Sequence, residues 1–324
     1  MKKFGILIMV FLFIFMLSAL GFSKTITLRL GHAVVETHPY HLGAVKFAEL
    51  IKERTNGQIQ IKIFPNHILG NERDMVEGLQ LGTIDMVVTS TGPIGGFAPK
   101  MMAVDFPFIF RNREHAYKVL DGDIGKLLLS DLEKVGIKGL AFWENGFRNI
   151  TNSKRPINKP EDLKGIKIRV MENKVHIASF KALGANPTPM AWSEVFTALQ
   201  QGTIDAQENP IPIIYNFKLY EVQKYLSMTQ HFYSPALLLM SKTKFASLPK
   251  KTQEIFVKTA IEVATYERNL IKEQEDKQIG LLKEKGMIIN YPDREPFRLA
   301  TKKVYDEFKD KVGADIINAI LNTK

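Results

Sequence analysis

Two arginines and an asparagine lie where predicted strands end, and their side chains suit the binding of an anion. Arg169 lies near the end of the alternating run 166–170, and Arg148 and Asn209 each follow another short strand-like stretch. Two guanidinium groups can hold a carboxylate through charge-assisted bidentate hydrogen bonds, and an amide can donate to or accept from the same group. The sequence therefore predicts a carboxylate clamp, although either arginine alone would also fit a structural or surface position.

Other side chains near predicted strand and helix ends could complete a site, because ligands of open α/β sheets bind there. They are six polar residues expected to reach the distal hydroxyl groups of a bound acid and one aromatic residue expected to stack on it: His32, His38, Glu72, Arg73, Ser90, Thr91 and Trp192. Glu72 also suits a plain helix start, where the dipole favours a carboxylate. Trp192 also suits the core.

The histidines near the N-terminus do not predict a metal site. His32, His38 and His41 are close in sequence, but no acidic ligand has a fixed spacing to them, so hydrogen bonding is the better interpretation. The chain has no HExxH, Walker, GxGxxG or GxSxG motif. We therefore expect no metal, no cofactor and no catalytic residues, since an enzyme would need a base beside a nucleophile or a metal.

The first residues have the pattern of a secretory signal peptide. Lys2 and Lys3 form a short basic region, 4–20 is almost entirely apolar and 21–23 is a small-x-small site, so cleavage is expected before Lys24. An uncleaved membrane anchor is the alternative, because the apolar stretch is near the length that spans a bilayer. A signal peptide at 1–23 predicts a mature chain in the periplasm.

The composition excludes several kinds of site. The 324 residues include no cysteine, which excludes disulfides, thiolate chemistry and a lipid-modified cysteine after the signal peptide. Removal of Lys2 and Lys3 lowers the formal net charge from +10 to +8. A basic surface favours anionic ligands or lipids, or is simply a solvated surface. The mature chain is longer than one hydrophobic core usually organises, so two domains are expected.

The elements that carry these side chains alternate between strand and helix. The first unit runs through strands at 24–32, 59–63 and 83–89 with helices between them, which predicts a largely parallel sheet covered by helices. A second unit with the same plan begins at the strand 166–170. After Pro249 no proline interrupts the chain as far as about Lys285, so one or two helices are expected there, with enough length to brace both units.

Two segments echo each other and indicate two α/β units of like design. LQLGTID at 79–85 returns as LQQGTID at 199–205, which is 120 positions later and at the same place in its unit. Between the units, an apolar strand leads into 144–148, where we expect a turn that takes the chain from one domain to the other.

Long runs in both halves carry a family resemblance. They are FRNITNSKRPINKPEDLKGIKIRV, ALGANPTPMAWSEVFTALQQGTIDAQENP and YEVQKYLSMTQH in the second half, and IFPNHILGNERDMVEGLQLGTIDM and DFPFIF in the first. In these runs the chain resembles the DctP-type solute-binding proteins of tripartite ATP-independent periplasmic (TRAP) transporters, and the similarity covers nearly all of the mature chain. It implies a two-lobed protein that closes over an organic acid and delivers it to a membrane permease driven by an ion gradient.

The resemblance also implies which residues contact the ligand. In that family an arginine of the GxKxRV strand pairs with the ligand carboxylate, and here it is Arg169. The same matching adds Arg148, Asn209, Glu72, Ser90 and Trp192. Members that bind sialic acid carry an acidic residue in place of Ser90 and a phenylalanine in place of Trp192, which disfavours sialic acid for this chain.

The expected fold class is α/β, a two-lobed periplasmic binding protein in which each lobe is a mixed sheet flanked by helices and a long helix braces both. Domain I is expected at 24–144 plus 234–275, and domain II at 145–233 plus 276–324. This division follows the expected crossings between the lobes.

We expect non-catalytic binding of a small organic acid, with a sugar acid such as a uronate or aldonate favoured over a C4-dicarboxylate such as succinate, malate or fumarate. A second carboxylate would need another cation, and Arg73 is the only candidate at the far side. A ligand sensor for a membrane receptor is a third hypothesis, since it would use the same closure. The expected partners are the acid and the integral-membrane permease subunits, with no nucleic acid, and the protein is expected to be a monomer.

Overall fold

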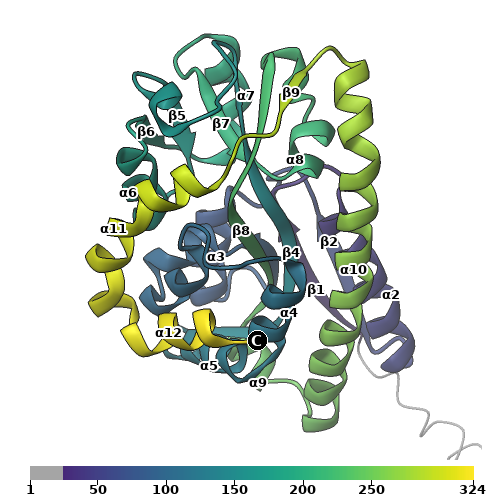
Figure 1. Ribbon diagram of the computed structural model, residues 1–324. Helices are drawn as coiled ribbons and strands as arrows, with labels where there is room; N and C mark the ends of the chain where they lie inside the picture. The colour runs from purple at the N-terminus through teal and green to yellow at the C-terminus, as the bar shows by residue number, and fades with distance from the viewer. Residues whose placement is uncertain (1–24) are drawn as a thin grey trace, which may run out of the picture.

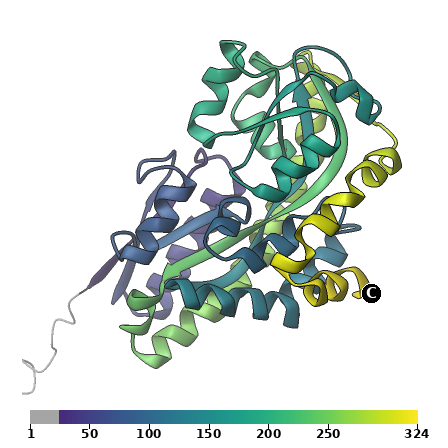
Figure 2. The same cartoon turned by 90° about the vertical axis from the view of Figure 1, so that its left-hand side faces the viewer.

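The computed structural model describes residues 25–324. The predicted signal peptide, 1–23, and the expected cleavage before Lys24 lie outside these residues. The described chain forms a nine-stranded sheet covered by helices and has two lobes (Figures 1 and 2), which confirms the predicted fold class. Within 25–324, no helix combines the length and the apolar content needed to cross a membrane.

Strands and helices alternate through most of the chain, as predicted. The strands are β1 (Ile26–His32), β2 (Ile59–Phe64), β3 (Met86–Ser90), β4 (Ile137–Asn152), β5 (Lys167–Val170), β6 (Asn186–Pro189), β7 (Ala206–Asn209), β8 (Tyr225–Ser241) and β9 (Ile288–Asn290). The α-helices are α2 (Pro39–Arg54), α3 (Glu72–Leu81), α4 (Arg113–Asp121), α5 (Asp123–Asp131), α6 (Lys174–Ala182), α7 (Trp192–Gln200), α8 (Ile211–Asn216), α9 (Lys242–Ala246), α10 (Lys250–Glu284), α11 (Glu295–Val312) and α12 (Ala314–Asn322).

The sheet is symmetric about its two longest strands. Its order is β2-β1-β3-β8-β4-β7-β5-β6, with β9 paired to β8. Each outer triplet, β2-β1-β3 and β7-β5-β6, is parallel and joins the central β8-β4 pair through an antiparallel contact. We call the part built on β1–β3 the first lobe and the part built on β5–β7 the second lobe. Because β4 and β8 have 16 and 17 residues, both strands run through the two lobes (Figure 1).

The repeated LQxGTID segments have the same structure in the two lobes. Gly82 and Gly202 follow their helices in the left-handed region, with φ of 71° and 70°, where glycine is favoured. Three residues after each glycine, an aspartate carboxylate accepts a main-chain N–H of the neighbouring parallel strand, at 2.8 Å for Asp85 and 3.0 Å for Asp205. The echo in the sequence is therefore a structural repeat, as predicted.

The prediction of a turn at 144–148 is wrong, because β4 continues through this segment paired with β8. The register between the two strands shifts between Glu144 and Gly146 and again between Arg148 and Ile150. Gly146 has a φ of 119°, which side chains other than glycine rarely adopt, so the glycine produces a β-bulge and a bend rather than a reversal. The chain therefore crosses between the lobes on a continuous, bulged strand.

The 35-residue helix α10 spans both lobes, as predicted (Figure 1). At 1.5 Å per residue its length is about 52 Å. It packs on α2 and β4 at one end and on α8 towards the other. The buried Glu267 of α10 accepts the N–H of Glu144, at the β4 bulge, at 2.9 Å. The helix is therefore attached to β4 at the point where the strand passes between the lobes.

The C-terminal helices return to the first lobe. Phe297, near the start of α11, lies in the core of the second lobe. Val304 and Ile320 lie instead in the core that contains Val87 of β3, and Figure 1 shows α12 beside α5. α11 therefore links the two lobes as a further connection besides β4, β8 and α10.

Candidate functional site

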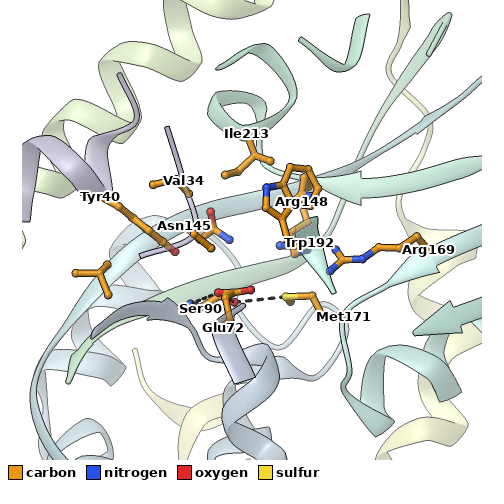
Figure 3. Close-up of a pocket in the computed structure, with 13 residues that line it drawn as sticks. Val34, Tyr40, Glu72, Ser90, Asn145, Arg148, Arg169, Met171, Trp192 and Ile213 are labelled. Carbon is orange, nitrogen blue, oxygen red and sulfur yellow. Dashed lines mark hydrogen bonds between the residues drawn. The ribbon is translucent and has the colours of Figure 1, made fainter. Parts of the chain in front are cut away.

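A cavity lies between the lobes and is lined by residues of both (Figure 3). Small-molecule sites are often found at such domain interfaces. Six of the ten predicted site residues line it, each from a different helix or strand: Glu72, Ser90, Arg148, Arg169, Trp192 and Asn209. The fold therefore brings together side chains that are up to 137 positions apart in the sequence.

Arg169 is a buried cation whose guanidinium points into the cavity from β5 (Figure 3). The residue is 3% exposed, and its Nε and Nη2 atoms donate to the Met190 carbonyl at 2.9 and 2.7 Å. Burial, and after it the nearby Arg148, lowers the pKa of Arg169 to about 10. No carboxylate among residues 25–324 forms an ion pair with it. A bound anion would therefore neutralise a buried charge.

Arg148, on β4, is already paired within the protein. Its Nε and Nη2 atoms donate to the Glu208 carboxylate at 2.5 and 2.8 Å, and Nη2 also donates to the Glu208 carbonyl. Only Nη1 has no partner in the described part of the chain, and it is buried in a residue that lines the cavity. The two arginines therefore differ: Arg169 offers an unpaired charge, and Arg148 offers one nitrogen of a neutralised pair.

Glu208 and His231 hold Arg148 from behind, and sequence analysis missed both. All three side chains are buried, and His231 Nε2 lies 3.1 Å from Glu208 Oε2. Although burial opposes ionisation, the contacts with Arg148 and His231 hold the pKa of Glu208 well below its ordinary value. The QENP motif contains Glu208, but only the register of β4 against β7, which places Ile150 opposite Glu208, reveals the pairing.

Asn209 ends β7 and lies in the wall that carries the two arginines. It is 4% exposed, and its Nδ2 atom donates to Gln207 Oε1 at 2.6 Å. Gln207 in turn donates to Thr151 Oγ1 at 2.8 Å. This series of hydrogen bonds fixes the orientation of the Asn209 amide at the cavity.

Glu72 forms the opposite wall, at the first position of α3. Its Oε1 atom accepts three hydrogen bonds, from Thr89 Oγ1 at 2.8 Å and from the main-chain N–H and Oγ of Ser90 at 3.0 Å. Its Oε2 atom makes no hydrogen bond within 25–324. This wall therefore combines a carboxylate oxygen with a hydroxyl group, whereas the facing wall is cationic.

Trp192 lines the cavity and also packs against the core, so both positions expected from the sequence apply to it, while stacking on a ligand stays a prediction. The Arg169 guanidinium lies over its indole, 5.6 Å from the ring centroid, which is within cation–π distance. The indole also packs edge-on against Phe217, with ring centroids 4.9 Å apart. Trp192 therefore lines the cavity and covers Arg169 while it contacts the core.

Arg73 and Thr91 do not line the cavity. Arg73 pairs with Glu77 at 3.1 Å and has a half-exposed side chain in a smaller, neighbouring pocket. Thr91 Oγ1 donates to Asp105 Oδ1 at 2.6 Å, and Asn173 of the second lobe donates to the other oxygen of that carboxylate at 2.8 Å. Thr91 therefore supports a contact between the lobes.

His32 and His38 lie behind the cavity wall rather than in it. His32 Nδ1 accepts the N–H of Val34 at 3.3 Å, and His38 Nδ1 accepts the N–H of Tyr40 at 3.2 Å. Both histidines are fully buried, whereas Val34 and Tyr40 line the cavity. Within the part of the chain that the structure describes, no group of His, Asp and Glu side chains is arranged to hold a metal ion.

Two polar residues of the cavity also escaped the sequence analysis. Tyr40 Oη and Asn145 Oδ1 are buried at the cavity and have no partner among the described residues. Tyr40 follows the His-Pro pair at a helix start, and Asn145 lies in the segment expected to be a turn. The position of Tyr40 in the first turn of a predicted helix is the sequence feature that could have indicated it as a site residue.

The chain is similar to bacterial extracellular binding proteins over almost all of its length. Residues 30–311 match the family described as bacterial extracellular solute-binding protein, family 7 (DctP). The 2,3-diketo-L-gulonate-binding periplasmic protein YiaO of Escherichia coli is 44% identical over 298 residues, covering 91% of both chains. The C4-dicarboxylate-binding periplasmic protein DctP of Rhodobacter capsulatus is 34% identical over 309 residues, covering 94% of this chain and 92% of the relative.

A solved structure has the same fold as this chain. A TRAP periplasmic solute binding protein from Polaromonas, bound to D-erythronate, has a TM-score of 0.90 and 45% identity to this chain. The match covers 92% of this chain and 99% of that chain.

Proposed function

The chain belongs to the DctP family of bacterial extracellular solute-binding proteins, and from this premise we propose that its cavity binds a sugar acid such as a uronate or an aldonate. Proteins of this family bind solutes for transporters and do not convert them, which confirms the expectation that the chain is not an enzyme. Its partners are a small organic acid and the membrane subunits of a TRAP permease.

The observation that carries the proposal is the buried, unpaired charge of Arg169. A carboxylate at Arg169 would receive charge-assisted hydrogen bonds in a site that excludes most water, where such bonds are strong. Arg148 Nη1 and the Asn209 amide would complete its coordination. Among these three groups only Arg169 contributes a net charge, so this wall is matched to a single carboxylate.

The opposite wall favours hydroxyl groups over a second carboxylate. Glu72 brings a negative charge to the cavity, and beside it lie the hydroxyl groups of Ser90 and Tyr40. A dicarboxylate would place its second charge near Glu72, whereas a hydroxyl group would donate to the free Glu72 oxygen. Arg73, the cation that a dicarboxylate would need, is paired with Glu77 outside the cavity.

The relatives support the same choice. The proteins named for 2,3-diketo-L-gulonate and solved with D-erythronate are 44% and 45% identical to this chain, and both ligands are hydroxylated monocarboxylates. The relative named for C4-dicarboxylates is 34% identical. A C4-dicarboxylate therefore remains the second candidate.

DctP-family proteins are periplasmic, and we propose that 1–23 directs this chain there as a cleaved signal peptide.

We also propose that the lobes move about the β4 bulge at Gly146, so that closure traps the acid. We divide the chain between the lobes as follows. The first lobe comprises 24–144, 234–275 and the C-terminal end from about residue 304. The second lobe comprises 145–233 with the rest of 276–324. The placement of the C-terminal end follows the first-lobe contacts of α12.

A thermal-shift screen of the mature protein tests the ligand class. A ligand that binds only the native state raises the midpoint once its concentration exceeds the dissociation constant. We expect a rise with D-galacturonate, D-glucuronate or D-galactonate and a smaller one, or none, with succinate and malate. Stabilisation by succinate alone would contradict the sugar-acid proposal, and titration calorimetry would then give the affinity of each acid that raises the midpoint.

A further inference from the structure

Tyr40 ends in a hydroxyl group that no protein atom satisfies. The residue is 3% exposed, and its Oη atom is buried without a hydrogen-bond partner in the described chain. Asn145 Oδ1 is also buried without a partner, and Figure 3 shows both side chains on the side of the cavity away from Arg169. Buried polar groups without partners cost free energy, and a ligand that hydrogen-bonds to them would offset this cost.

These two groups have complementary requirements. Burial, with smaller effects from neighbouring carboxylates, raises the pKa of Tyr40 well above its ordinary value, so the phenol keeps its proton and can donate. Asn145 Oδ1 can only accept. A ligand hydroxyl group can accept from one and donate to the other, whereas a carboxylate cannot donate to Asn145.

His38 holds Tyr40 from behind. It is the N-cap residue of α2, where its Nδ1 atom accepts the Tyr40 N–H at 3.2 Å and its ring meets the Tyr40 ring edge to face at 4.8 Å. An Nδ1 atom that accepts carries no proton, so the ring is neutral with its proton on Nε2. Burial, with a contribution from His32, lowers the pKa of His38 to about 3, which agrees with a neutral ring.

Helix capping alone does not require a histidine at this position. Serine, threonine, aspartate and asparagine are the side chains that usually accept an N–H bond at a helix start. A histidine adds a flat ring, and this ring lies against the one residue of the first turn that lines the cavity with a polar group.

We propose that Tyr40 contacts the ligand, hydrogen-bonding through Oη to a hydroxyl group distant from the carboxylate, and that His38 is the positioning residue that sets the direction of the Tyr40 side chain. This inference rests on the proposed function, because it assigns the far end of the same acid. With Asn145, it defines a hydroxyl-binding end of the cavity opposite the carboxylate-binding end at Arg169.

A double-mutant cycle tests the two roles together. Calorimetric titration with D-galacturonate and D-galactonate would compare the parent with Tyr40→Phe, His38→Leu and the double variant. Loss of one neutral hydrogen bond predicts an affinity lower by roughly threefold to tenfold for each single variant. If His38 acts through Tyr40, the double variant binds about as well as Tyr40→Phe, because the losses do not add. Fully additive losses, or a Tyr40→Phe variant that binds like the parent, would overturn the proposal.

Two further variants separate positioning from general stability. His38→Asn keeps an acceptor at the place of Nδ1, so it should retain more affinity than His38→Leu. His32→Leu removes the corresponding bond to Val34, whose side chain is apolar, and its effect should add to that of Tyr40→Phe. Unfolding midpoints of all variants show whether any loss of affinity reflects unfolding.

A measurement without ligand distinguishes the failure of this inference from the failure of the proposed function. Amide hydrogen exchange at Tyr40 should accelerate in His38→Leu and remain slow in His38→Asn, and imidazole nitrogen shifts should place the His38 proton on Nε2. If these results hold while no sugar acid binds the parent, the ligand proposal is wrong and with it the contact assigned to Tyr40. A proton on Nδ1 would refute the role of His38 whatever acid binds.

Discussion

The two α/β units share one arrangement of strands, helices and helix ends, which we call the frame, and they differ where they face the cavity. β1 pairs with β3 in the same register, relative to the repeated LQxGTID segment, as β5 pairs with β7. This register and the offset of 120 positions make three pairs of positions equivalent: Gly31 and Arg169, Glu72 and Trp192, and Val88 and Glu208. The first unit has glycine, carboxylate and valine at these positions, and the second has a cation, an indole and a carboxylate.

The residues that the two units share make the fold, and the residues in which they differ make the site. Gly82 and Gly202 set the helix ends, and Asp85 and Asp205 attach the neighbouring strands, so the frame needs the same residues in both units. The strand ends and helix starts do not contribute to this frame. They are therefore free to differ, and they divide the cavity into a cationic wall and a carboxylate and hydroxyl wall.

The largest effect is expected from breaking the buried pair of the second unit, which the first unit lacks. Glu208→Gln would leave Arg148 buried without its counterion, and breaking such a pair typically costs about 3–5 kcal/mol of unfolding free energy. Denaturant unfolding measures this loss. The matched control is the double variant Arg148→Met with Glu208→Val, which removes both charges and should recover most of the stability. A double variant as unstable as Glu208→Gln would contradict this account.

The same pair predicts a dependence of stability on pH. Because the pKa of Glu208 is held below its ordinary value in the folded protein, its contribution is present above the ordinary glutamate pKa and is lost as pH falls through the folded-state pKa. The parent should therefore lose stability in acid more steeply than Glu208→Gln. Unfolding midpoints measured from neutral to acidic pH check this, and parallel curves would contradict it.

The next effect concerns Arg169, the cation that replaces Gly31 of the first unit. Arg169→Ala should weaken sugar-acid binding by about 2–5 kcal/mol, because the ligand carboxylate would be buried without its charged partner. The unliganded protein should lose less stability than Glu208→Gln, since Arg169 pairs with no carboxylate of the described chain and its hydrogen bonds go to the Met190 carbonyl alone. Calorimetry and thermal unfolding of the same variant check both statements. Arg169→Lys is the control that keeps the charge but loses the bidentate geometry, so it should bind with intermediate affinity.

A smaller effect is expected at Glu72, the carboxylate of the first unit. Glu72→Gln can keep the Oε1 bonds to Thr89 and Ser90 but removes the negative charge at the cavity. Hydrogen bonds to charged groups are worth about 1.5–3 kcal/mol, so D-galacturonate should bind correspondingly more weakly. Succinate should gain affinity, because its second carboxylate no longer meets a like charge. Equal losses for the two acids would mean that Glu72 does not distinguish them.

The sequence predicted the frame because its signals are local. The alternating strands, the glycines after the helices and the repeated LQxGTID segment each lie within a few residues, and all have the predicted structure. Arg169 and Glu72 were found for the same reason, since each lies at an element end. Their roles at the site remain predictions until a ligand is measured.

The parts that the sequence did not predict depend on contacts between distant segments. Arg148 meets Glu208 only because β4 lies next to β7 in a particular register, and the pattern of neither strand indicates this register. The sequence predicts a turn where the structure has a bulge at Gly146, because a glycine in a polar segment is typical of both. His38 and Tyr40 are two positions apart in the sequence, and packing at the start of α2 decides which of them faces the cavity.

The smallest effect tests the shared frame itself. Gly82→Ala and Gly202→Ala would place a side chain in the left-handed region, at positions where the added Cβ meets no other atom, so each should cost about 1 kcal/mol of unfolding free energy through the backbone alone. The control is Gly280→Ala in α10, where the Cβ is also free of contacts but the backbone is helical, and stability should rise by about 0.5–1 kcal/mol. Equal losses at the two repeat glycines would support one frame used twice. A loss at only one of them would mean that the two units have diverged in their frame as well as in their cavity residues.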